Sequence, residues 1–271
     1  MLNNKNVIRK KIQMDNGKKS SFDVYLQGGA TADIQKKPKN KHDMNITEKS
    51  ELVYKQATDI VDALYKNPEN LANYQKAQDA VRELVALILD DDFALRSLMS
   101  IATHDYYTHT HSLNVSVYAV SLGMFLGLRK RDLRELGEAA LLHDLGKNKI
   151  KTSIINKDGK LTDLEYEEVK HHSEYGFEIS EHIGIKNKRI LEAIKYHHEK
   201  LDGSGYPDGL KGEDIPLFAR IIGVCDIFDA LSSKRSYKDA MQTFDVLKLM
   251  KTKMKDELDM ELLNKMITMF R

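Results

Sequence analysis

The chain has 271 residues, of which 41% are hydrophobic and one is a cysteine, so it can bury a sizeable core and has no internal disulfide. Its net charge of +1 argues against a nucleic acid polymer as the partner. No apolar run approaches the roughly 20 residues of a membrane span, and no signal peptide is expected. With four prolines and no tryptophan, the sequence is typical of a predominantly helical, cytoplasmic protein.

The first 45 residues are predicted to form a β-hairpin followed by a basic linker. Residues 7–26 place Asn16 and Gly17 between two apolar runs, and this dipeptide favours the tight turn of a hairpin. Residues 1–50 contain 11 Lys and Arg but only 5 Asp and Glu. A basic arm of this kind is most often simply solvated.

A helical pattern begins at residue 46. Apolar residues recur at helical spacing over 53–64 and again over 77–88, and Thr47 is a candidate N-cap. No cluster of reactive side chains lies in this region. We therefore expect residues 46–100 to form a small helical unit for packing or interaction, with a homodimer through these helices as one candidate assembly.

The most informative stretch of the chain is the adjacent pair His143 and Asp144, which follows an apolar run. An imidazole nitrogen can hold one metal ion, and a carboxylate can bridge two. Gly146 is expected at the C-terminus of the preceding helix, and Lys147 follows it. Such a pair is common by chance, so its meaning depends on the other candidate ligands.

Further histidines stand on the apolar faces of predicted helices. His111 lies nearest the apolar stripe of one helix, and His172 shares a face with residues 169, 176 and 179, whereas His171 points away. His197 and His198 continue an apolar stripe together. A lone buried histidine is usually a satisfied core residue, but burying adjacent imidazoles without partners costs several kcal/mol. A cation would satisfy them.

Two features after the paired histidines complete the pattern. The glycine-rich segment 199–209 must be a loop, and it should lie over the site because it follows the histidines directly. Asp226 and Asp229 then occupy one face of an otherwise apolar helix. Asp226 is predicted to bind metal. Asp229 is predicted to orient a metal ligand or Arg235 by a hydrogen bond without binding the metal itself. Cys225 is predicted to be a core residue.

These observations define seven candidate metal ligands. They are His111, His143, Asp144, His172, His197, His198 and Asp226. Seven ligands exceed the needs of one ion, but two ions bridged by Asp144 would receive about four bonds each, as in binuclear hydrolases of phosphate esters. Mixed nitrogen and oxygen ligands favour Fe or Mn, with Ni, Co and Zn as alternatives. Lys147, Arg235 and Lys238 could neutralise a phosphate, or could be ordinary surface cations.

Three ordered motifs carry a family resemblance over more than half of the chain, from about residue 106 to the C-terminus. They are His143-Asp144-x-x-Lys147, then His197-His198-Glu199 followed by Asp202-Gly203-x-Gly205-Tyr206-Pro207, and finally Asp226-x-x-Asp229 within an apolar helix. In these motifs the chain resembles the HD-GYP family of bacterial cyclic di-GMP phosphodiesterases, a branch of the HD superfamily of metal-dependent phosphohydrolases.

The resemblance implies an all-α, HD-type helical bundle around a binuclear metal site, occupying residues 101–271. It implies hydrolysis of cyclic di-GMP to linear pGpG, with GMP as a further product, and it matches all seven candidates to the family's ligand positions. Asp144 and Lys147 would be catalytic. The substrate would be contacted by Lys147, Arg235 and Lys238 and by the loop residues Gly205, Tyr206 and Pro207, a loop that also implies a protein partner.

One position departs from the family pattern. Members with three metals carry a glutamate where this chain has Tyr107, so we expect two metals. The alternatives are a phosphodiesterase for another cyclic dinucleotide or a nucleoside phosphate, and a catalytically weak, metal-bound sensor of cyclic di-GMP or partner-binding module. The complete ligand set argues against a pure sensor, which has no need of every ligand.

Overall fold

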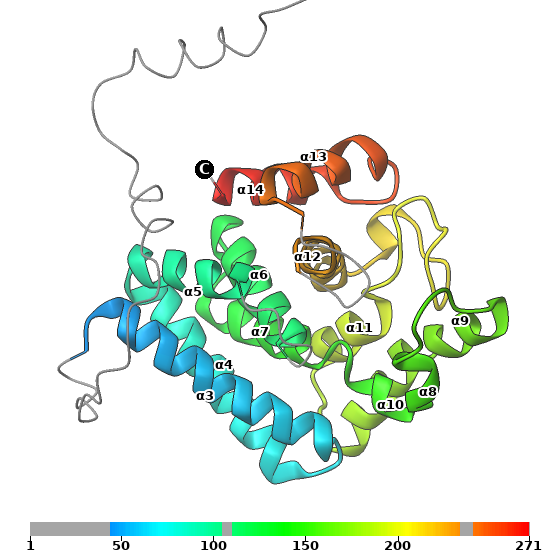
Figure 1. The fold of residues 1–271 in the computed structure, drawn as a ribbon, viewed down its shortest axis with the longest axis horizontal. Helices are drawn as coiled ribbons and strands as arrows, with labels where there is room; N and C mark the ends of the chain where they lie inside the picture. The colour runs from blue at the N-terminus through cyan, green and yellow to red at the C-terminus, as the bar shows by residue number, and fades with distance from the viewer. Residues whose placement is uncertain (1–43, 105–109, 234–240, 271) are drawn as a thin grey trace, which may run out of the picture. The chain divides into compact units, whose positions relative to one another are not determined.

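The structure is a computed structural model that describes residues 44–104, 110–233 and 241–270, within one compact unit that begins at Met44. Every regular element in these ranges is a helix (Figure 1), so the predicted all-α class is confirmed. Within the same ranges, each helix is too short or too polar to cross a bilayer. The β-hairpin predicted at residues 7–26 lies outside the described residues.

Three helices open the described chain. They are α3 (Ile46–Lys66), α4 (Leu71–Asp90) and α5 (Asp92–His104). The N-cap of α3 is Asn45, whose side chain accepts from the backbone N–H of Glu48 while the Glu48 carboxylate accepts from that of Asn45. This reciprocal capping box begins the helix ahead of Thr47, so the prediction of Thr47 as N-cap is wrong.

The central helix is α6 (His111–Phe125), which packs against α5, α7 (Lys130–Leu142) and α12 (Leu217–Ser232). Every residue of α6 from Ser112 to Gly123 is buried. The helix is therefore buried on all sides, whereas the sequence predicts a single apolar stripe. Its polar groups are satisfied inside the core, because Ser116 donates to the Gly137 carbonyl at 2.8 Å and Asn114 accepts from a tyrosine hydroxyl of α3. Helix α6 is therefore the axis of the bundle.

The remaining elements surround α6 and α7. They are η1 (Leu145–Lys149), α8 (Thr152–Ile155), α9 (Asp163–Lys170), α10 (His172–His182), α11 (Lys188–Tyr196), η2 (Gly212–Asp214), α12 (Leu217–Ser232), α13 (Thr243–Lys253) and α14 (Met260–Met269). The predicted helix through residues 169–179 is in fact two helices, because the chain bends at His171 between α9 and α10. Cys225 is fully buried in α12, as expected of a core residue.

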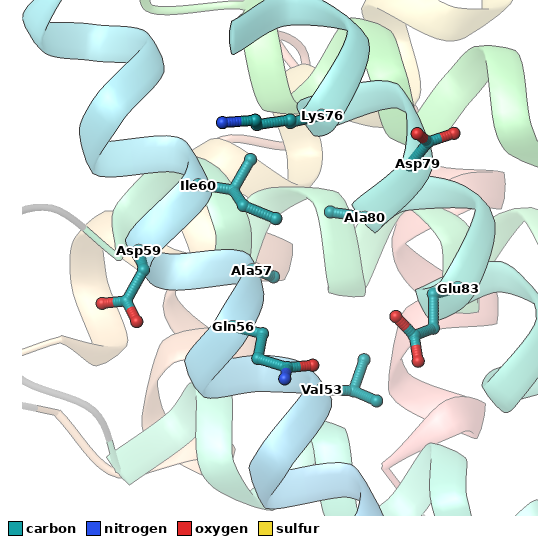
Figure 2. Close-up of a pocket in the computed structure, with 9 residues that line it drawn as sticks. All are labelled: Val53, Gln56, Ala57, Asp59, Ile60, Lys76, Asp79, Ala80 and Glu83. Atoms are coloured by element: carbon teal, nitrogen blue, oxygen red, sulfur yellow. The ribbon is translucent and has the colours of Figure 1, made fainter.

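Helices α3 and α4 share one apolar core with the later helices. The predicted boundary near residue 100 falls inside the compact unit and stays a prediction. A cavity of about 430 Å³ lies between α3 and α4 (Figure 2). Its lining residues are Val53, Gln56, Ala57, Asp59, Ile60, Lys76, Asp79, Ala80 and Glu83. None of them is a candidate ligand, so the cavity is separate from the site described below.

Candidate metal centre

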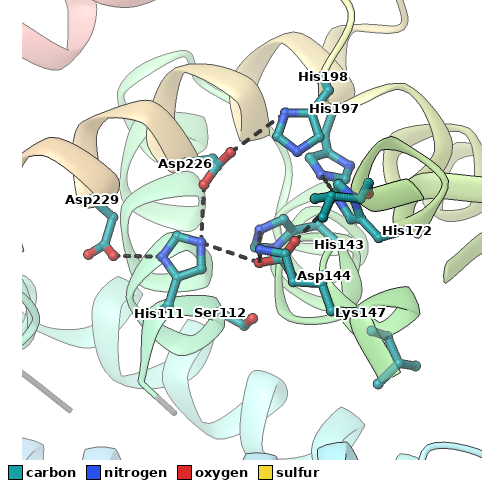
Figure 3. A network of polar contacts seen from close by, with 12 residues as sticks. His111, Ser112, His143, Asp144, Lys147, His172, His197, His198, Asp226 and Asp229 are labelled. Atoms are coloured by element: carbon teal, nitrogen blue, oxygen red, sulfur yellow. Dashed lines mark hydrogen bonds and ion pairs between the residues drawn. The ribbon is translucent and has the colours of Figure 1, made fainter. Parts of the chain in front are cut away.

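The seven predicted ligands come together from separate parts of the bundle (Figure 3). They are His111 at the start of α6, His143 and Asp144 after α7, His172 at the start of α10, His197 and His198 after α11, and Asp226 within α12. Six of the seven therefore stand at or just beyond helix ends, and only Asp226 lies inside a helix. The helices fix the backbone at these points while the side chains turn inward.

Asp144 lies between two groups of histidines. Its Oδ2 is 3.6 Å from His111 Nε2 and 3.5 Å from His143 Nε2, whereas its Oδ1 is 3.4 Å from His172 Nε2. Potential ligand atoms of Asp144, His111 and His143 lie within 4.8 Å of one another. The same holds for Asp144 with His172 and the paired histidines 197 and 198. Each oxygen of this carboxylate thus faces a different potential ion site.

Asp226 connects the same two groups on another side. Its Oδ1 lies 3.1 Å from His111 Nε2, and its Oδ2 lies 3.9 Å from His198 Nδ1. In Figure 3 its carboxylate reaches between these two rings. Asp226 can therefore complete a ligand set on either side, in agreement with its carboxylate pointing into the cluster rather than into solvent.

Three of the imidazoles are held in one orientation by backbone carbonyls. The Nδ1 atoms of His143, His172 and His197 lie 2.6, 2.7 and 2.7 Å from the carbonyl oxygens of Ala140, Val169 and Ile194. A carbonyl only accepts, so each Nδ1 carries the proton and each neutral ring keeps a lone pair on Nε2. All three lone pairs are available to the cluster.

The arrangement of these lone pairs fits a cation. His172 Nε2 and His197 Nε2 are only 3.3 Å apart, and two acceptors at this distance have no proton to share. His143 Nε2 and Asp144 Oδ1 are buried with no hydrogen-bond partner among the described residues, which costs about 1–3 kcal/mol per group. A divalent ion would satisfy all of these atoms at once, so the cluster is able to hold metal.

The protonation of the histidines agrees with this interpretation. Burial lowers the pKa of His143 and His172, lowers that of His197 well below its ordinary value and brings that of His198 to about 3. These four rings are therefore neutral near pH 7, and a neutral ring is the form that binds metal. Five imidazoles and two carboxylates without a thiolate suit a transition metal.

His111 is oriented differently, by a second carboxylate. Its Nδ1 lies 2.7 Å from Oδ2 of Asp229, which is almost fully buried in α12. Burial alone would lower the pKa of His111, but the contacts with Asp226 and Asp229 outweigh it and raise the pKa to about 10. Asp229 thus holds the ring with Nε2 towards the cluster, which is how carboxylates commonly fix a metal-binding imidazole.

The segment after the His-Asp pair is compact. Lys147 Nζ lies 2.5 Å from Asp144 Oδ2, and its side chain is 38% exposed, so it links the cluster to solvent. Gly146 lies within η1 rather than at a left-handed helix end, so its prediction as a C-terminal glycine is wrong. A Cβ at Gly146 would lie 1.9 Å from the carbonyl oxygen of His172. Glycine is needed there for close packing on α10.

The predicted loop 199–209 borders the cluster through Tyr206. The ring centroid of Tyr206 lies 4.8 Å from that of His198 and 6.3 Å from that of His172. Pro207 follows through a cis peptide bond. Gly205 packs on the start of the loop, where a Cβ would lie 2.4 Å from the backbone nitrogen of Lys200.

Glu199 closes this loop, a role that no sequence pattern indicated. Its carboxylate accepts three backbone N–H groups, from Asp208 at 2.7 Å, Gly209 at 2.9 Å and Leu210 at 3.1 Å. Because Glu199 directly follows the paired histidines, the far end of the loop is tied to the ligands themselves. Three other residues of interest, Arg235, Lys238 and Tyr107, lie outside the described residues.

Comparison of the sequence with known proteins identifies its family. The sequence model of the HD domain family matches residues 93–262. The chain is 38% identical over 174 residues to "Cyclic di-GMP phosphodiesterase PA4108" of Pseudomonas aeruginosa, covering 64% of this chain and 42% of that protein. It is 34% identical over 214 residues to "3'3'-cGAMP-specific phosphodiesterase 3" of Vibrio cholerae, covering 75% and 46% respectively.

A third relative and a solved structure agree. The chain is 50% identical over 119 residues to "Cyclic di-GMP phosphodiesterase response regulator RpfG" of Xanthomonas campestris pv. campestris, covering 42% of this chain and 31% of that protein. It thus spans less than half the length of these three relatives. The fold is similar to that of Bd1817, an HDGYP protein from Bdellovibrio bacteriovorus, with a TM-score of 0.72, 19% identity and coverage of 86% and 74%. The chain therefore belongs to the HD domain family, and its sequence relatives are of the HD-GYP type.

Proposed function

We propose that this chain is a metal-dependent phosphodiesterase that hydrolyses cyclic di-GMP to linear pGpG. The observation that carries the proposal is the position of Asp144, whose two oxygens face two separate groups of histidines. Two ions sharing one carboxylate are an established arrangement for cleaving phosphate esters. The names of relatives that are 34–50% identical support a cyclic dinucleotide as the substrate.

The proposed site has two metal ions. One would be held by His111, His143 and Asp144, and the other by Asp144, His172 and the paired histidines 197 and 198, with Asp226 available to either. When bound, the ions would supply Lewis acidity to the phosphoryl oxygens and activate water. Fe or Mn is favoured by the mixed nitrogen and oxygen ligands, and Ni, Co and Zn are alternatives. Tyr107, in place of a glutamate, supports two metals rather than three.

The other residues act on the substrate or on the ligands. Lys147 would place its ammonium beside a phosphoryl oxygen, where negative charge grows during in-line attack, and its partial exposure lets a substrate reach it. Asp229 would hold His111 in its metal-binding orientation. Arg235 and Lys238 are proposed to contact the substrate phosphates, and Tyr206, with Gly205 and Pro207, to form a wall of the binding site.

The proposal is tested by reconstitution. Protein loaded with Mn²⁺ or Fe²⁺ should convert cyclic di-GMP to pGpG, as followed by chromatography of the products. Asp144→Ala should lower kcat/KM by at least about 10²-fold, because both ion sites lose a ligand. The matched control is Glu213→Ala, an exposed carboxylate of η2 that should behave as the wild type. Full activity of Asp144→Ala would refute the assignment.

Hydrolysis of a different cyclic dinucleotide is the second candidate. It is supported by the similarity to the V. cholerae protein named as specific for 3'3'-cGAMP. The two substrates are separated by measuring kcat/KM for each with one metal-loaded preparation. A binding titration beside the turnover assay distinguishes an enzyme from a metal-bound sensor, since a sensor would bind cyclic di-GMP without consuming it.

We also propose a location, a domain organisation and protein contacts for this chain. We infer a cytoplasmic protein, supported by its single, buried cysteine. The domains proposed are 1–45, 46–100 and 101–271. The loop around Tyr206 is proposed to contact a protein partner, and helices α3 and α4 to mediate a homodimer, which sedimentation analysis would test.

A further inference from the structure

A second tyrosine extends the wall that Tyr206 forms beside the cluster. The Nζ atom of Lys170 lies 5.8 Å from the ring centroid of Tyr206 and 5.0 Å from that of Tyr166. Both distances are within the range of cation–π attraction. Tyr166 and Lys170 belong to α9, whereas Tyr206 belongs to the loop after α11. One ammonium group therefore joins two aromatic rings from different elements.

These three side chains form a continuous row that leads away from the cluster. Tyr206 contacts His198, with ring centroids 4.8 Å apart and planes inclined by 31°. Lys170 is held in place by Glu167, whose Oε1 lies 2.6 Å from its Nζ. Tyr166 stands at the outer end and is 49% exposed. About half of its surface is therefore open to a ligand.

We propose that Tyr166 and Lys170, together with Tyr206, form a binding subsite for one purine base of the nucleotide substrate. Bases stack on aromatic rings because every base offers a flat π-face, and an exposed ring next to a phosphate-cleaving centre offers such a surface. An ammonium group donates to the O6 and N7 acceptors of guanine, whereas adenine carries a donor in place of O6. The subsite therefore favours guanine over adenine. This inference rests on the proposed function, of which it specifies the base recognition.

The stacking part of the proposal is tested with two substrates. Tyr166→Ala should raise KM for cyclic di-GMP by roughly tenfold, the size expected for loss of one stacked base, with kcat unchanged within about twofold. Hydrolysis of methyl 4-nitrophenyl phosphate, a diester without a purine, should be unchanged. Tyr166→Phe keeps the ring and should match the wild type. The control is Leu164→Ala, which alters an 85% exposed residue of the same helix. It should leave kcat and KM unchanged for both substrates.

The guanine preference is tested at Lys170. Lys170→Ala should reduce the ratio of kcat/KM for cyclic di-GMP to that for cyclic di-AMP by about fivefold or more, because the lost donor has two acceptors on guanine and only N7 on adenine. An equal loss on both dinucleotides and on the base-free diester would mean that Lys170 contacts phosphate, and the proposed preference would be overturned. Unchanged KM in Tyr166→Ala, or an equal rise for both types of substrate, would overturn the stacking role.

Binding measurements keep this inference separate from the proposed function. If the wild type cleaves the base-free diester but no cyclic dinucleotide, the proposed function fails. Calorimetric titration of the metal-loaded protein with GMP then decides the subsite alone. A Kd raised about tenfold by Tyr166→Ala supports the base site, and equal affinity of the two proteins, or no binding to either, refutes it.

Discussion

Asp144 is the residue on which both ion sites depend. Its Oδ2 faces His111 and His143, its Oδ1 faces His172, and its Oδ2 also receives the Lys147 ammonium. Full burial by itself would raise the pKa of this carboxyl, but the nearby Lys147 and histidines outweigh it and lower the pKa well below its ordinary value. The carboxylate is therefore charged throughout the physiological range and ready to bind cations.

The close packing of Gly146 against α10 can be tested by a single substitution. Gly146→Ala would place a Cβ 1.9 Å from the His172 carbonyl oxygen and 2.4 Å from the Gly176 nitrogen, and backbone atoms of packed helices cannot yield easily. We expect a loss of about 1–3 kcal/mol in unfolding free energy and a lower metal content, because α10 carries His172. Urea denaturation and elemental analysis measure the two effects.

The control for Gly146 lies across the same contact. A Cβ at Gly176 would come nearest to the side chain of Ile194, at 3.0 Å, and its backbone neighbours would stay at 3.4 Å or more. Gly176→Ala should therefore cost less and keep its metal. Equal behaviour of the two variants would contradict the account of close packing at η1.

Residue patterns in the sequence indicate the metal ligands better than they indicate the residues that position those ligands. Histidines on apolar stripes indicate burial, and this signal led to His172 and the pair at 197 and 198. The local sequence predicts a helix end at Gly146, because it cannot show that the distant His172 carbonyl approaches this residue. Glu199 was not recognised for the same reason, since the backbone groups that it binds come together only when the loop folds.

At the scale of elements, Arg189 of α11 ties together three helices that position ligands. Its Nη1 lies 2.7 Å from Asp132 Oδ1 and 2.9 Å from Glu135 Oε2, both on α7. Its guanidinium carbon lies 4.1 Å from the ring centroid of Phe218 on α12. These helices lead to His143, to the paired histidines 197 and 198, and to Asp226, so the contact fixes their spacing from outside the cluster.

The contribution of this contact should depend on pH. Hydrogen bonds from Arg129 and Arg189 lower the pKa of Asp132 from 3.8 to about 2, and its side chain is 8% exposed. A carboxyl with a depressed folded-state pKa stabilises the fold fully above 3.8 and loses this effect as the pH falls through 2. Asp132→Asn should therefore cost about 1–2 kcal/mol at pH 7, and about half of that at pH 3.

Urea unfolding of the wild type and Asp132→Asn at both pH values tests this expectation. Asp79→Asn is the control, because Asp79 pairs with Arg82 on an exposed face and such pairs contribute little. A difference between wild type and Asp132→Asn that is the same at pH 7 and pH 3 would show that the ion pair is not its source.

Elements with strong periodicity were predicted well, and their interruptions were not. Helices α3 and α4 follow the apolar spacing that the sequence shows over 53–64 and 77–88. The break between α9 and α10 at His171 interrupts a pattern that continues across it, so it follows from the packing of α10 on η1. Helix α5 has its buried residues at helical spacing over 94–102, a pattern that is readable but absent from the predicted elements.

At the scale of the whole molecule, metal binding and folding should be coupled. The ligands come from helices that are far apart in the sequence and are adjacent only in the folded state. Bound metal therefore stabilises the folded chain selectively, by about 2.7 kcal/mol at 100 times its Kd. Removing it with a chelator should lower Tm by roughly 5–10 °C.

Thermal unfolding with and without added Mn²⁺ measures this shift. Asp144→Ala should show a much smaller shift, because the carboxylate common to both groups is missing. An identical Tm for metal-loaded and metal-free wild type would indicate that the cluster binds no ion tightly.

The way in which α7 and α11 end has one more consequence. His143 and His197 are the residues that follow these helices directly, and each donates its Nδ1–H to a carbonyl of the last turn. The last turn of a helix carries a partial negative charge, so two helix dipoles bring their negative ends to the cluster. The starts of α6 and α10, at His111 and His172, bring two partial positive charges to the same cluster. The four helix ends therefore largely offset one another, and the negative potential of the cluster comes from its two carboxylates. The backbone thus contributes by fixing the tautomer and direction of these imidazoles, and it leaves the charge of the cluster to its side chains.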